Sequence, residues 1–308
     1  MKYLTTKEIA EKWGISDRTV RRYCTQNLIA GVKVKDNHFL IPDWAEQPSS
    51  KDRKNAIKKK ELTSLAKRVV YEKGKNNHYG IYEYIQVNLT YSSNRMASNR
   101  LTREQVMELF RTNKISPAFE PMKVDDLIET VNHFACVRMV VDNIQEPLSV
   151  DLIRQLHHTL YYGTYADRKQ EVLKGELRTV SSKRGCKPNE IRPSLLKLIN
   201  NYEAIKNPTM DDLLDFHVKF EKICPFADGN GRVGRLILLK ECLRQGIDPF
   251  FVDDKHRGAY NSGIESWGRD KSLLTETCAK AQQRFQAQRE LLKLMQYCKG
   301  NTIMEDEI

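Results

Sequence analysis

Residues 223–235 bring together side chains that can bind a phosphate group and a metal ion. The run Gly229–Gly231 lets the backbone curl so that several N–H groups point inward, and a helix that starts there adds partial positive charge. Arg232 and Arg235 lie three residues apart, and arginine can grip phosphate with two hydrogen bonds. These residues predict a phosphate site. The alternative is a glycine turn whose arginines face solvent.

Asp228 stands directly before the glycines. Its carboxylate would repel an anion unless a cation lay between them, and Mg²⁺ binds carboxylate and phosphate oxygens together. We therefore predict that Asp228 is a Mg²⁺ ligand shared with a bound phosphate.

The sequence around this loop predicts the helices that position it. One helix should end near Ile223, because Pro225 disfavours helical geometry in the residue before it. Apolar residues recur at helical spacing over residues 124–134, 152–160 and 213–223, while strand-like alternation is scarce beyond residue 62. The predicted fold class is mainly α.

The loop resembles the signature of the Fic (Fido) family, which reads His-Pro-Phe-x-Asp-Gly-Asn-Gly-Arg-x-x-Arg. This chain matches every defined position except the first, where it has Cys224. The similarity extends over roughly residues 80–285 and includes residues 216–221, Tyr260 and Trp267. The resemblance implies a Fic-type helical domain.

The resemblance also implies an activity, because the family transfers AMP, or occasionally another phosphate-containing group, from a nucleotide to a protein hydroxyl. ATP and Mg²⁺ would be the cofactors, and the partner would be a target protein with a Ser, Thr or Tyr hydroxyl, or the chain itself. Asp228 would hold Mg²⁺ between the α- and β-phosphates, and Arg235 would grip the terminal phosphate. The anion hole would be formed by Gly229, Asn230 and Gly231. Residues 174–180 resemble the family's flap, a hairpin that holds the target by strand addition.

Cys224 departs from the family at the position of the catalytic histidine. The histidine is a general base, which suits its unperturbed pKa of about 6.5, whereas a thiol with a pKa of about 8.5 is mostly protonated at pH 7. Losing a general base typically costs a factor of about 10²–10⁴, so AMP transfer should be slow or absent. The nearest histidine, His217, lies on an apolar stripe and is expected to be a packed core residue.

Residues 91–102 resemble the family's inhibitory helix, in which a glutamate pairs with the second arginine of the loop. Ser93 matches the start of that pattern, but Ala97 stands at the glutamate position. Arg235 should therefore be free for a γ-phosphate. Loss of both the general base and the inhibitory glutamate would be consistent with a pseudoenzyme that binds a nucleotide without transferring AMP.

The first 48 residues form a separate pattern. Residues 6–13 predict a short helix capped by Thr5 or Thr6 and ended by Gly14, and Ser16 caps a second helix over residues 17–25. Residues 28–42 alternate, turn at Asp36-Asn37 and alternate again, as a β-hairpin does.

This pattern resembles the winged helix-turn-helix of the excisionase and MerR-like families. In such modules the outward residues of the second helix enter the major groove of duplex DNA. The candidate DNA-binding residues are Arg18, Thr19, Arg21 and Arg22. The alternative is a structural or docking module.

Charge and composition suggest the domain organisation. Residues 1–68 carry 16 basic and 8 acidic residues, so they hold most of the net charge of +11; a polyanion partner or a solubilising tail would explain this. We expect a winged helix-turn-helix at 1–48, a basic linker at 49–75, a Fic-like domain at 76–288 and a tail at 289–308. The linker's cations could contact phosphates or form a solvated helix face.

The sequence also favours a cytoplasmic protein without a membrane segment. Seven scattered cysteines form no CxxC pair, and the first 16 residues are too charged for a signal peptide. The main functional hypothesis is protein AMPylation. The alternative is a DNA-binding regulator in which a catalytically silent Fic-like domain senses nucleotide. The resemblance further implies a homodimer.

Overall fold

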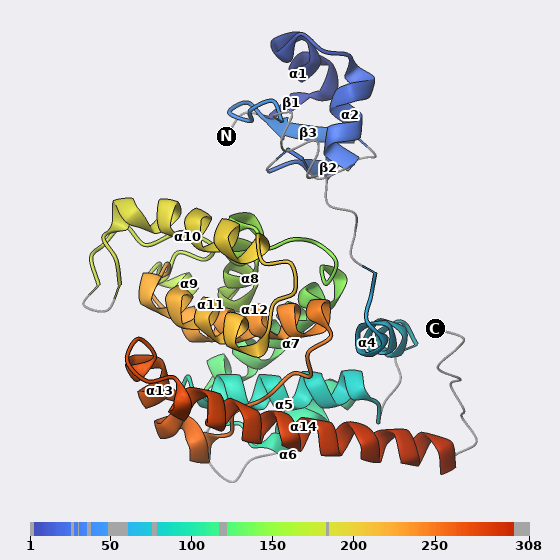
Figure 1. Ribbon diagram of the computed structural model, residues 1–308, viewed down its shortest axis with the longest axis vertical. Coiled ribbons are helices and arrows are strands. Elements are labelled where there is room, and N and C mark those ends of the chain that lie inside the picture. Colours follow the sequence, from blue (N-terminus) through green and yellow to red (C-terminus); the bar gives the residue numbers. More distant parts are fainter. Residues whose placement is uncertain are drawn as a thin grey trace. The chain divides into compact units, whose positions relative to one another are not determined.

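The computed structural model describes residues 3–25, 28–29, 31–35, 38–48, 61–75, 79–116, 122–182 and 185–298 (Figure 1). The chain divides into two compact units, Met1–Lys60 and Glu61–Ile308.

The first unit contains two short helices joined by a glycine turn. Helix α1 (Thr6–Trp13) begins at Thr5, which forms a reciprocal capping box with Glu8, and it ends at Gly14 in the left-handed conformation (φ 64°). Helix α2 (Asp17–Thr25) begins after Ser16, whose Oγ accepts a hydrogen bond from the Thr19 backbone N–H at 3.2 Å. Both predicted helices are confirmed, because local capping residues fix their ends.

A small antiparallel sheet completes this unit. Strands β2 (Lys33–Lys35) and β3 (His38–Pro42) form the predicted hairpin, whose expected turn at Asp36-Asn37 lies outside the described residues. The sequence did not predict β1 (Tyr3–Thr5), which pairs with the other side of β3. Three residues are too few for an alternation pattern. The helices and sheet enclose a core that includes Ile9, Val20, Tyr23, Ile29 and Ile41.

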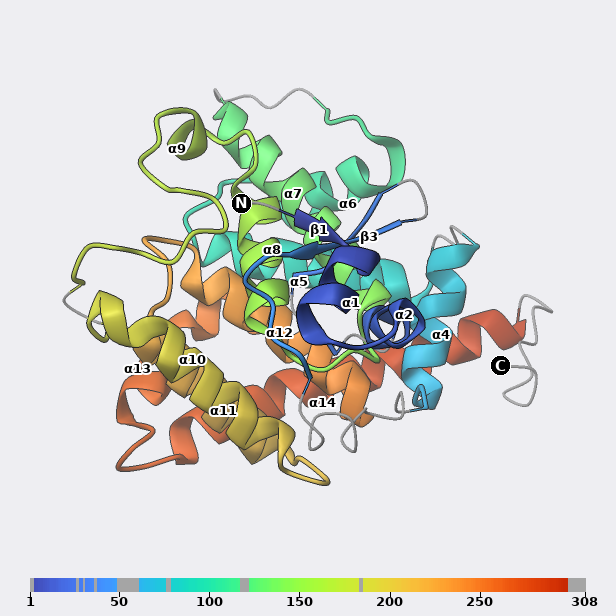
Figure 2. The same cartoon turned by 90° about the horizontal axis from the view of Figure 1, so that it is seen from above.

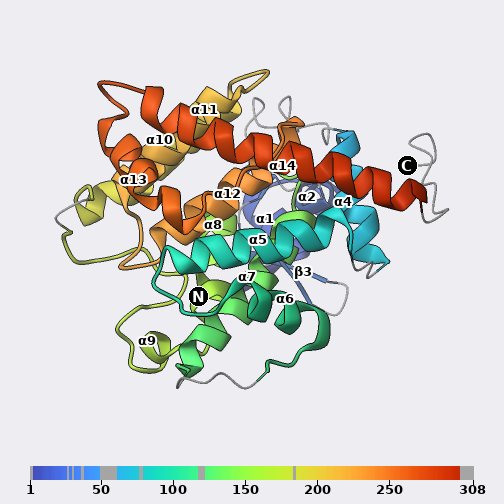
Figure 3. The same ribbon diagram turned by 90° about the horizontal axis from the view of Figure 1, so that it is seen from below.

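The second unit is built from helices, as predicted, and its described residues contain no strand. The helices are α4 (Ser64–Gly74), α5 (Ile81–Arg95), α6 (Arg103–Thr112), α7 (Val124–Asp142), α8 (Val150–Tyr161), α9 (Tyr165–Arg168), α10 (Pro188–Glu203), α11 (Met210–Ile223), α12 (Asn230–Gln245), the 3₁₀ helix η1 (Asp254–His256), α13 (Arg257–Ser266) and α14 (Ser272–Cys298). Helices α10 and α11 pack against each other, and in the view from above α10 lies over α11 (Figure 2). In the view from below, α14 runs beside α5, where Tyr84 and Phe285 have ring centroids 5.9 Å apart (Figure 3).

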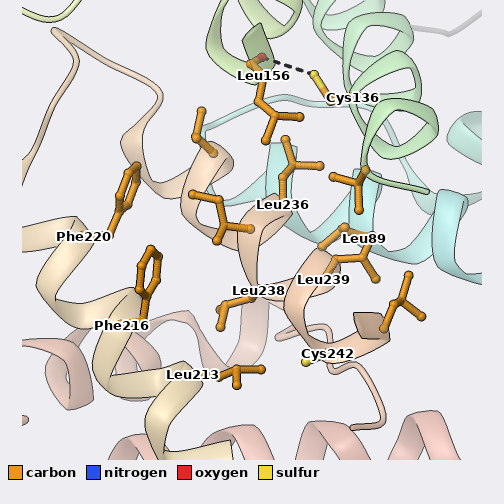
Figure 4. Close-up of a cluster of buried hydrophobic side chains, with 14 of the residues drawn as sticks. Leu89, Cys136, Leu156, Leu213, Phe216, Phe220, Leu236, Leu238, Leu239 and Cys242 are labelled. Carbon is orange, nitrogen blue, oxygen red and sulfur yellow. Dashed lines mark hydrogen bonds between the residues drawn. The ribbon is translucent and has the colours of Figure 1, made fainter. Parts of the chain in front are cut away.

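Helix α12 lies at the centre of this unit and contacts α4, α5, α7, α8 and α11. Its first apolar residues, Val233 and Leu236 to Leu239, are all buried. Figure 4 shows Leu236, Leu238 and Leu239 of α12 among side chains of α5, α8 and α11, with Phe216 and Phe220 one turn apart on α11. A helix that is buried on most of its faces is held by its neighbours in one position. The loop that precedes α12 is therefore anchored at its carboxyl end by the core.

The ends of this unit differ from the sequence-based boundaries. Part of the stretch expected as linker, 49–75, is helix α4, and its Leu65, Ala66 and Val69 are buried in the large core. Helix α14 continues past residue 288 to Cys298. The predicted frayed segment 301–308 and the basic run 51–60 lie outside the described residues. Among the described helices, none is long and apolar enough to cross a membrane.

Candidate active site

The candidate site is the loop between α11 and α12. Helix α11 ends at Ile223, as predicted, and Cys224 takes the left-handed conformation (φ 50°) while its N–H donates to the Phe220 carbonyl at 3.1 Å. Pro225 explains the break, since its ring disfavours helical geometry at Cys224. Helix α12 begins at Asn230, so the glycine-containing segment lies at a helix amino terminus, where unpaired N–H groups attract anions.

Asn230 fixes the shape of this loop. Its Oδ1 accepts the Phe226 N–H at 2.9 Å, and its Nδ2 donates to the Phe226 carbonyl at 2.9 Å and to Cys224 Sγ at 3.4 Å. The side-chain amide is thus used inside the loop. Asn230 can contribute to an anion site through its backbone N–H.

Gly229 meets two requirements that only glycine satisfies. Its φ is 77°, in the left-handed region, and a Cβ there would lie 2.5 Å from Tyr161 Cε2. The backbone must therefore pass against the Tyr161 ring without a side chain. This contact sets the position of the first N–H groups of α12.

Asp228 points outward from the loop. Its side chain is 72% exposed, its Oδ1 accepts the Gly229 N–H at 2.7 Å, and its Oδ2 lies 4.0 Å from Arg232 Nη2. An accessible carboxylate beside backbone donors fits a Mg²⁺ ion that is shared with phosphate oxygens. No cluster of three His, Cys, Asp or Glu side chains that could hold a metal occurs in the described part of the chain, so phosphate and water would have to supply the other ligands.

Arg232 lies elsewhere than the sequence suggested. The sequence predicted that Arg232 binds a phosphate, yet its side chain is buried. It pairs with Glu129 at 3.0 Å and donates to the Tyr161 hydroxyl at 2.7 Å. Its guanidinium also lies over the Tyr161 ring, 5.0 Å from the centroid. This arginine supports the ring on which Gly229 rests.

Arg235 reaches the end of α5 instead of standing free. Its Nε donates to Ser93 Oγ at 3.0 Å and its Nη2 donates to the Ser93 carbonyl at 3.1 Å. Ser93 therefore accepts hydrogen bonds from two of the guanidinium nitrogens. Ala97 is exposed in the turn after α5 and places no carboxylate near Arg235. The guanidinium still adjoins the loop, because Nη1 lies 3.1 Å from the point that a Cβ on Gly231 would occupy.

Sequence reasoning missed His157, which braces the loop from α8. Its ring stacks on Phe226 with centroids 3.9 Å apart, its Nδ1 accepts the Gly175 N–H at 2.8 Å, and its Nε2 lies 3.2 Å from the Asp228 carbonyl. Burial lowers the pKa of His157 to about 4, so the ring is neutral at pH 7 and donates through Nε2. Its place on the apolar stripe of α8 concealed this role.

The expected flap hairpin at 174–180 is not formed, since the described residues 171–182 contain no strand. Their polar groups are used elsewhere. Gly175 donates to His157, and the Arg178 N–H donates to the Pro225 carbonyl at 2.9 Å. The segment is pinned onto the loop and α8 instead of pairing with itself.

The core histidine predicted at position 217 is confirmed. His217 is buried, its Nε2 lies 2.6 Å from the Tyr260 hydroxyl, and burial lowers its pKa to about 3. Gly234 allows this packing, because a Cβ there would lie 2.8 Å from the His217 ring.

The candidate DNA-binding residues of the first unit share one helix, α2. Arg18, Arg21 and Arg22 are exposed, and Arg21 pairs with Asp17 at 2.8 Å. Thr19 is half-buried, and its hydroxyl lies 2.8 Å from Ser16 Oγ. Thr19 therefore belongs to the helix cap.

Residues 147–242 match the model of the Fic/DOC family. The chain is 24% identical over 162 residues to a probable protein adenylyltransferase of Aquifex aeolicus, an alignment that covers 48% of this chain and 49% of the relative. It is also 24% identical over 179 residues to the protein adenylyltransferase Fic of Nematostella vectensis. This alignment covers 54% of this chain and 40% of the relative. The chain thus spans about half the length, or less, of these curated relatives.

Two solved structures are similar to this fold. One is a Fic-domain-containing signaling protein from Bacteroides thetaiotaomicron, with a TM-score of 0.58, 19% identity and coverage of 79% of this chain and 93% of that one. The other is Fic-1 (aa134–508) from C. elegans, with a TM-score of 0.59, 17% identity and coverage of 75% and 74%. The helical Fic fold predicted from the loop is confirmed.

Proposed function

We propose that this chain binds Mg·ATP at the loop between α11 and α12 and is a Fic-type protein adenylyltransferase. The observation that carries the proposal is that the side chain of Asp228 faces outward at the amino terminus of the central helix α12. The backbone N–H groups at this terminus can bind an anion. The Fic/DOC match and the curated adenylyltransferase relatives support it. The target is a protein hydroxyl, on a partner or on the chain itself.

In the proposed reaction, the hydroxyl oxygen attacks the α-phosphorus of ATP, pyrophosphate leaves and the hydroxyl proton passes to water. Backbone N–H groups of Gly229 to Gly231 would receive the phosphate charge, and Arg235 would contact the terminal phosphate from its place beside Ser93. Asp228 would hold the Mg²⁺ ion, which would offset phosphate charge. Arg232 would act through Tyr161 as a positioning residue.

Cys224 limits the rate in this proposal. Its sulfur contacts the Asn230 amide and lies 3.9 Å from the Phe226 carbonyl, at the first position of the loop. A histidine there would accept the hydroxyl proton, and its absence should lower the rate of AMP transfer by about 10²–10⁴.

The test uses ATP labelled on the α-phosphate, with wild type, Cys224→His and the double variant Cys224→His/Asp228→Ala. We expect Cys224→His to label itself or a protein in a cell lysate far faster than wild type, and the double variant to lose the label. ATP labelled on the γ-phosphate is the control, because AMP transfer leaves no γ-label on protein. If Cys224→His binds Mg·ATP but transfers no label, the adenylyltransferase proposal is wrong.

The first unit suggests a second function, duplex DNA binding, which would make the chain a regulator with a nucleotide-sensing Fic domain. The observation in favour is that α2 exposes Arg18, Arg21 and Arg22 together. Gel retardation at low salt against a random duplex library tests it, with Arg18→Ala/Arg22→Ala as the variant and Lys219→Ala, on the other unit, as the control. Retention of binding by the double arginine variant would remove this hypothesis.

A further inference from the structure

Cys224, at the start of the candidate loop, and Cys186 differ in exposure from the other described cysteines. Cys24, Cys136, Cys242 and Cys278 are buried, and burial raises the pKa of Cys24 to about 11 and that of Cys136 and Cys278 to about 12. Only Cys186 and Cys224, among the cysteines whose side chains the structure describes, are partly exposed. Partly exposed thiols are the ones that oxidants reach.

Cys186 and Cys224 lie on neighbouring pieces of backbone. Cys186 Sγ is 3.6 Å from the carbonyl oxygen of Ile223, which belongs to the peptide group that leads into Cys224. A Cβ placed on Gly185 would lie 2.9 Å from Cys224 Cβ. The backbone next to Cys186 therefore packs directly on the Cys224 side chain.

One buried arginine holds these two pieces together. Arg178 donates through Nε to the Cys224 carbonyl at 2.7 Å and through Nη2 to the Ile223 carbonyl at 3.4 Å. The same Nη2 also donates to the Cys186 carbonyl. A single planar guanidinium thus binds the carbonyls of both cysteines and holds the two pieces of backbone together.

We propose that Cys186 and Cys224 form an oxidation site, in which a peroxide converts the two thiols into one disulfide. One thiolate attacks a peroxide oxygen, the O–O bond breaks, and a sulfenic acid and hydroxide form. The second thiolate then attacks the sulfenic sulfur, so that the S–S bond forms and the S–O bond breaks, releasing a second hydroxide. The hydroxides take up the two thiol protons as water. Two thiols are oxidised and one peroxide is reduced to two waters.

The disulfide would tie residue 186 to the first residue of the candidate loop and remove the Cys224 thiol. This proposal does not depend on AMP transfer, because it concerns the thiols of the protein alone.

The experiment treats the full chain, carrying Cys298→Ser, with one equivalent of hydrogen peroxide. Tryptic peptides are then mapped by mass spectrometry without reduction, and the unsubstituted chain is treated in parallel. We expect residues 185–197 and 223–232 to appear as one linked peptide, two hydrogen masses lighter than their sum, in a chain that stays monomeric. Dithiothreitol should separate the two peptides, and Cys186→Ser should abolish the link while Cys242→Ser leaves it.

A backbone variant tests the geometry without removing a thiol. Gly185→Ala should displace the segment from Cys224 and slow disulfide formation roughly tenfold, whereas Gly258→Ala, where a Cβ meets nothing within 4 Å, should not change the rate. Circular dichroism checks that both variants fold. Separate sulfenic acids trapped by dimedone, links to another cysteine or between chains, or no oxidation at these residues would each overturn the proposal.

Discussion

Gly229 shows how one residue without a side chain positions the candidate site. We predict that Gly229→Ala lowers stability by about 1–3 kcal/mol and displaces the loop, because the new Cβ adds left-handed strain and meets Tyr161. Urea unfolding and calorimetric titration with Mg·ATP measure the two effects. The matched control, Gly258→Ala, should be close to neutral. Full ATP affinity in Gly229→Ala would contradict this view of the loop.

The two loop arginines should separate into a structural and a ligand-binding residue. Arg232→Ala removes a buried guanidinium that pairs with the partly exposed Glu129 and donates to the Tyr161 hydroxyl, so we predict a loss of about 2–4 kcal/mol of stability. Arg235→Ala should cost less stability and more ATP affinity, since its guanidinium is half-buried beside the loop. Urea unfolding and calorimetric titration with ATP, measured on both variants, would show which arginine stabilises the fold and which binds the ligand. Equal stability losses would contradict it.

At the scale of elements, the contact between α5 and α12 controls the orientation of Arg235. We predict that Ser93→Ala weakens ATP binding roughly 3- to 10-fold, because the Ser93 hydroxyl no longer holds Arg235 Nε. Binding of AMP, which lacks the terminal phosphate, should change little. The control is Ser92→Ala on the same helix, whose hydroxyl bonds to the Leu89 carbonyl. Equal losses for ATP and AMP would disprove the role of Ser93.

The elements were largely predictable from sequence, while their side-chain partners were not. Caps at Thr5 and Gly14, the break at Pro225 and the apolar spacing of α7, α8 and α11 are local, so they fixed helix positions. The burial of Arg232 and the stacking of His157 on Phe226 depend on residues about 70 positions away, as the pairs Tyr161–Arg232 and His157–Asp228 illustrate with separations of 71. Periodicity carries no information on such pairs.

At the scale of the whole second unit, buried neutral histidines should make stability depend on pH. Burial lowers the pKa of His133 and His217 to about 3 and that of His157 to about 4, below the value of about 6.5 in an unfolded chain. As pH falls, the unfolded chain therefore binds more protons than the folded chain. The stability that these neutral histidines contribute is complete above pH 6.5 and is lost as pH falls towards their folded pKa values.

We predict that unfolding free energy falls between pH 7 and pH 5 by up to about 2 kcal/mol for each of these histidines. Urea unfolding at both pH values measures the change. His157→Gln should flatten the dependence, whereas His158→Gln, at the exposed neighbouring position, should not. Stability that is constant over this range would show that the three rings are not buried as neutral groups.

Calorimetric titration tests most directly whether Asp228 and the amino terminus of α12 bind Mg·ATP. We predict that wild type and Cys224→His bind ATP with similar affinity in the presence of Mg²⁺. Asp228→Asn should lose at least about tenfold in affinity with Mg²⁺ present, and much less with EDTA. Failure of wild type to bind ATP, or an unchanged affinity of Asp228→Asn in Mg²⁺, would contradict the account.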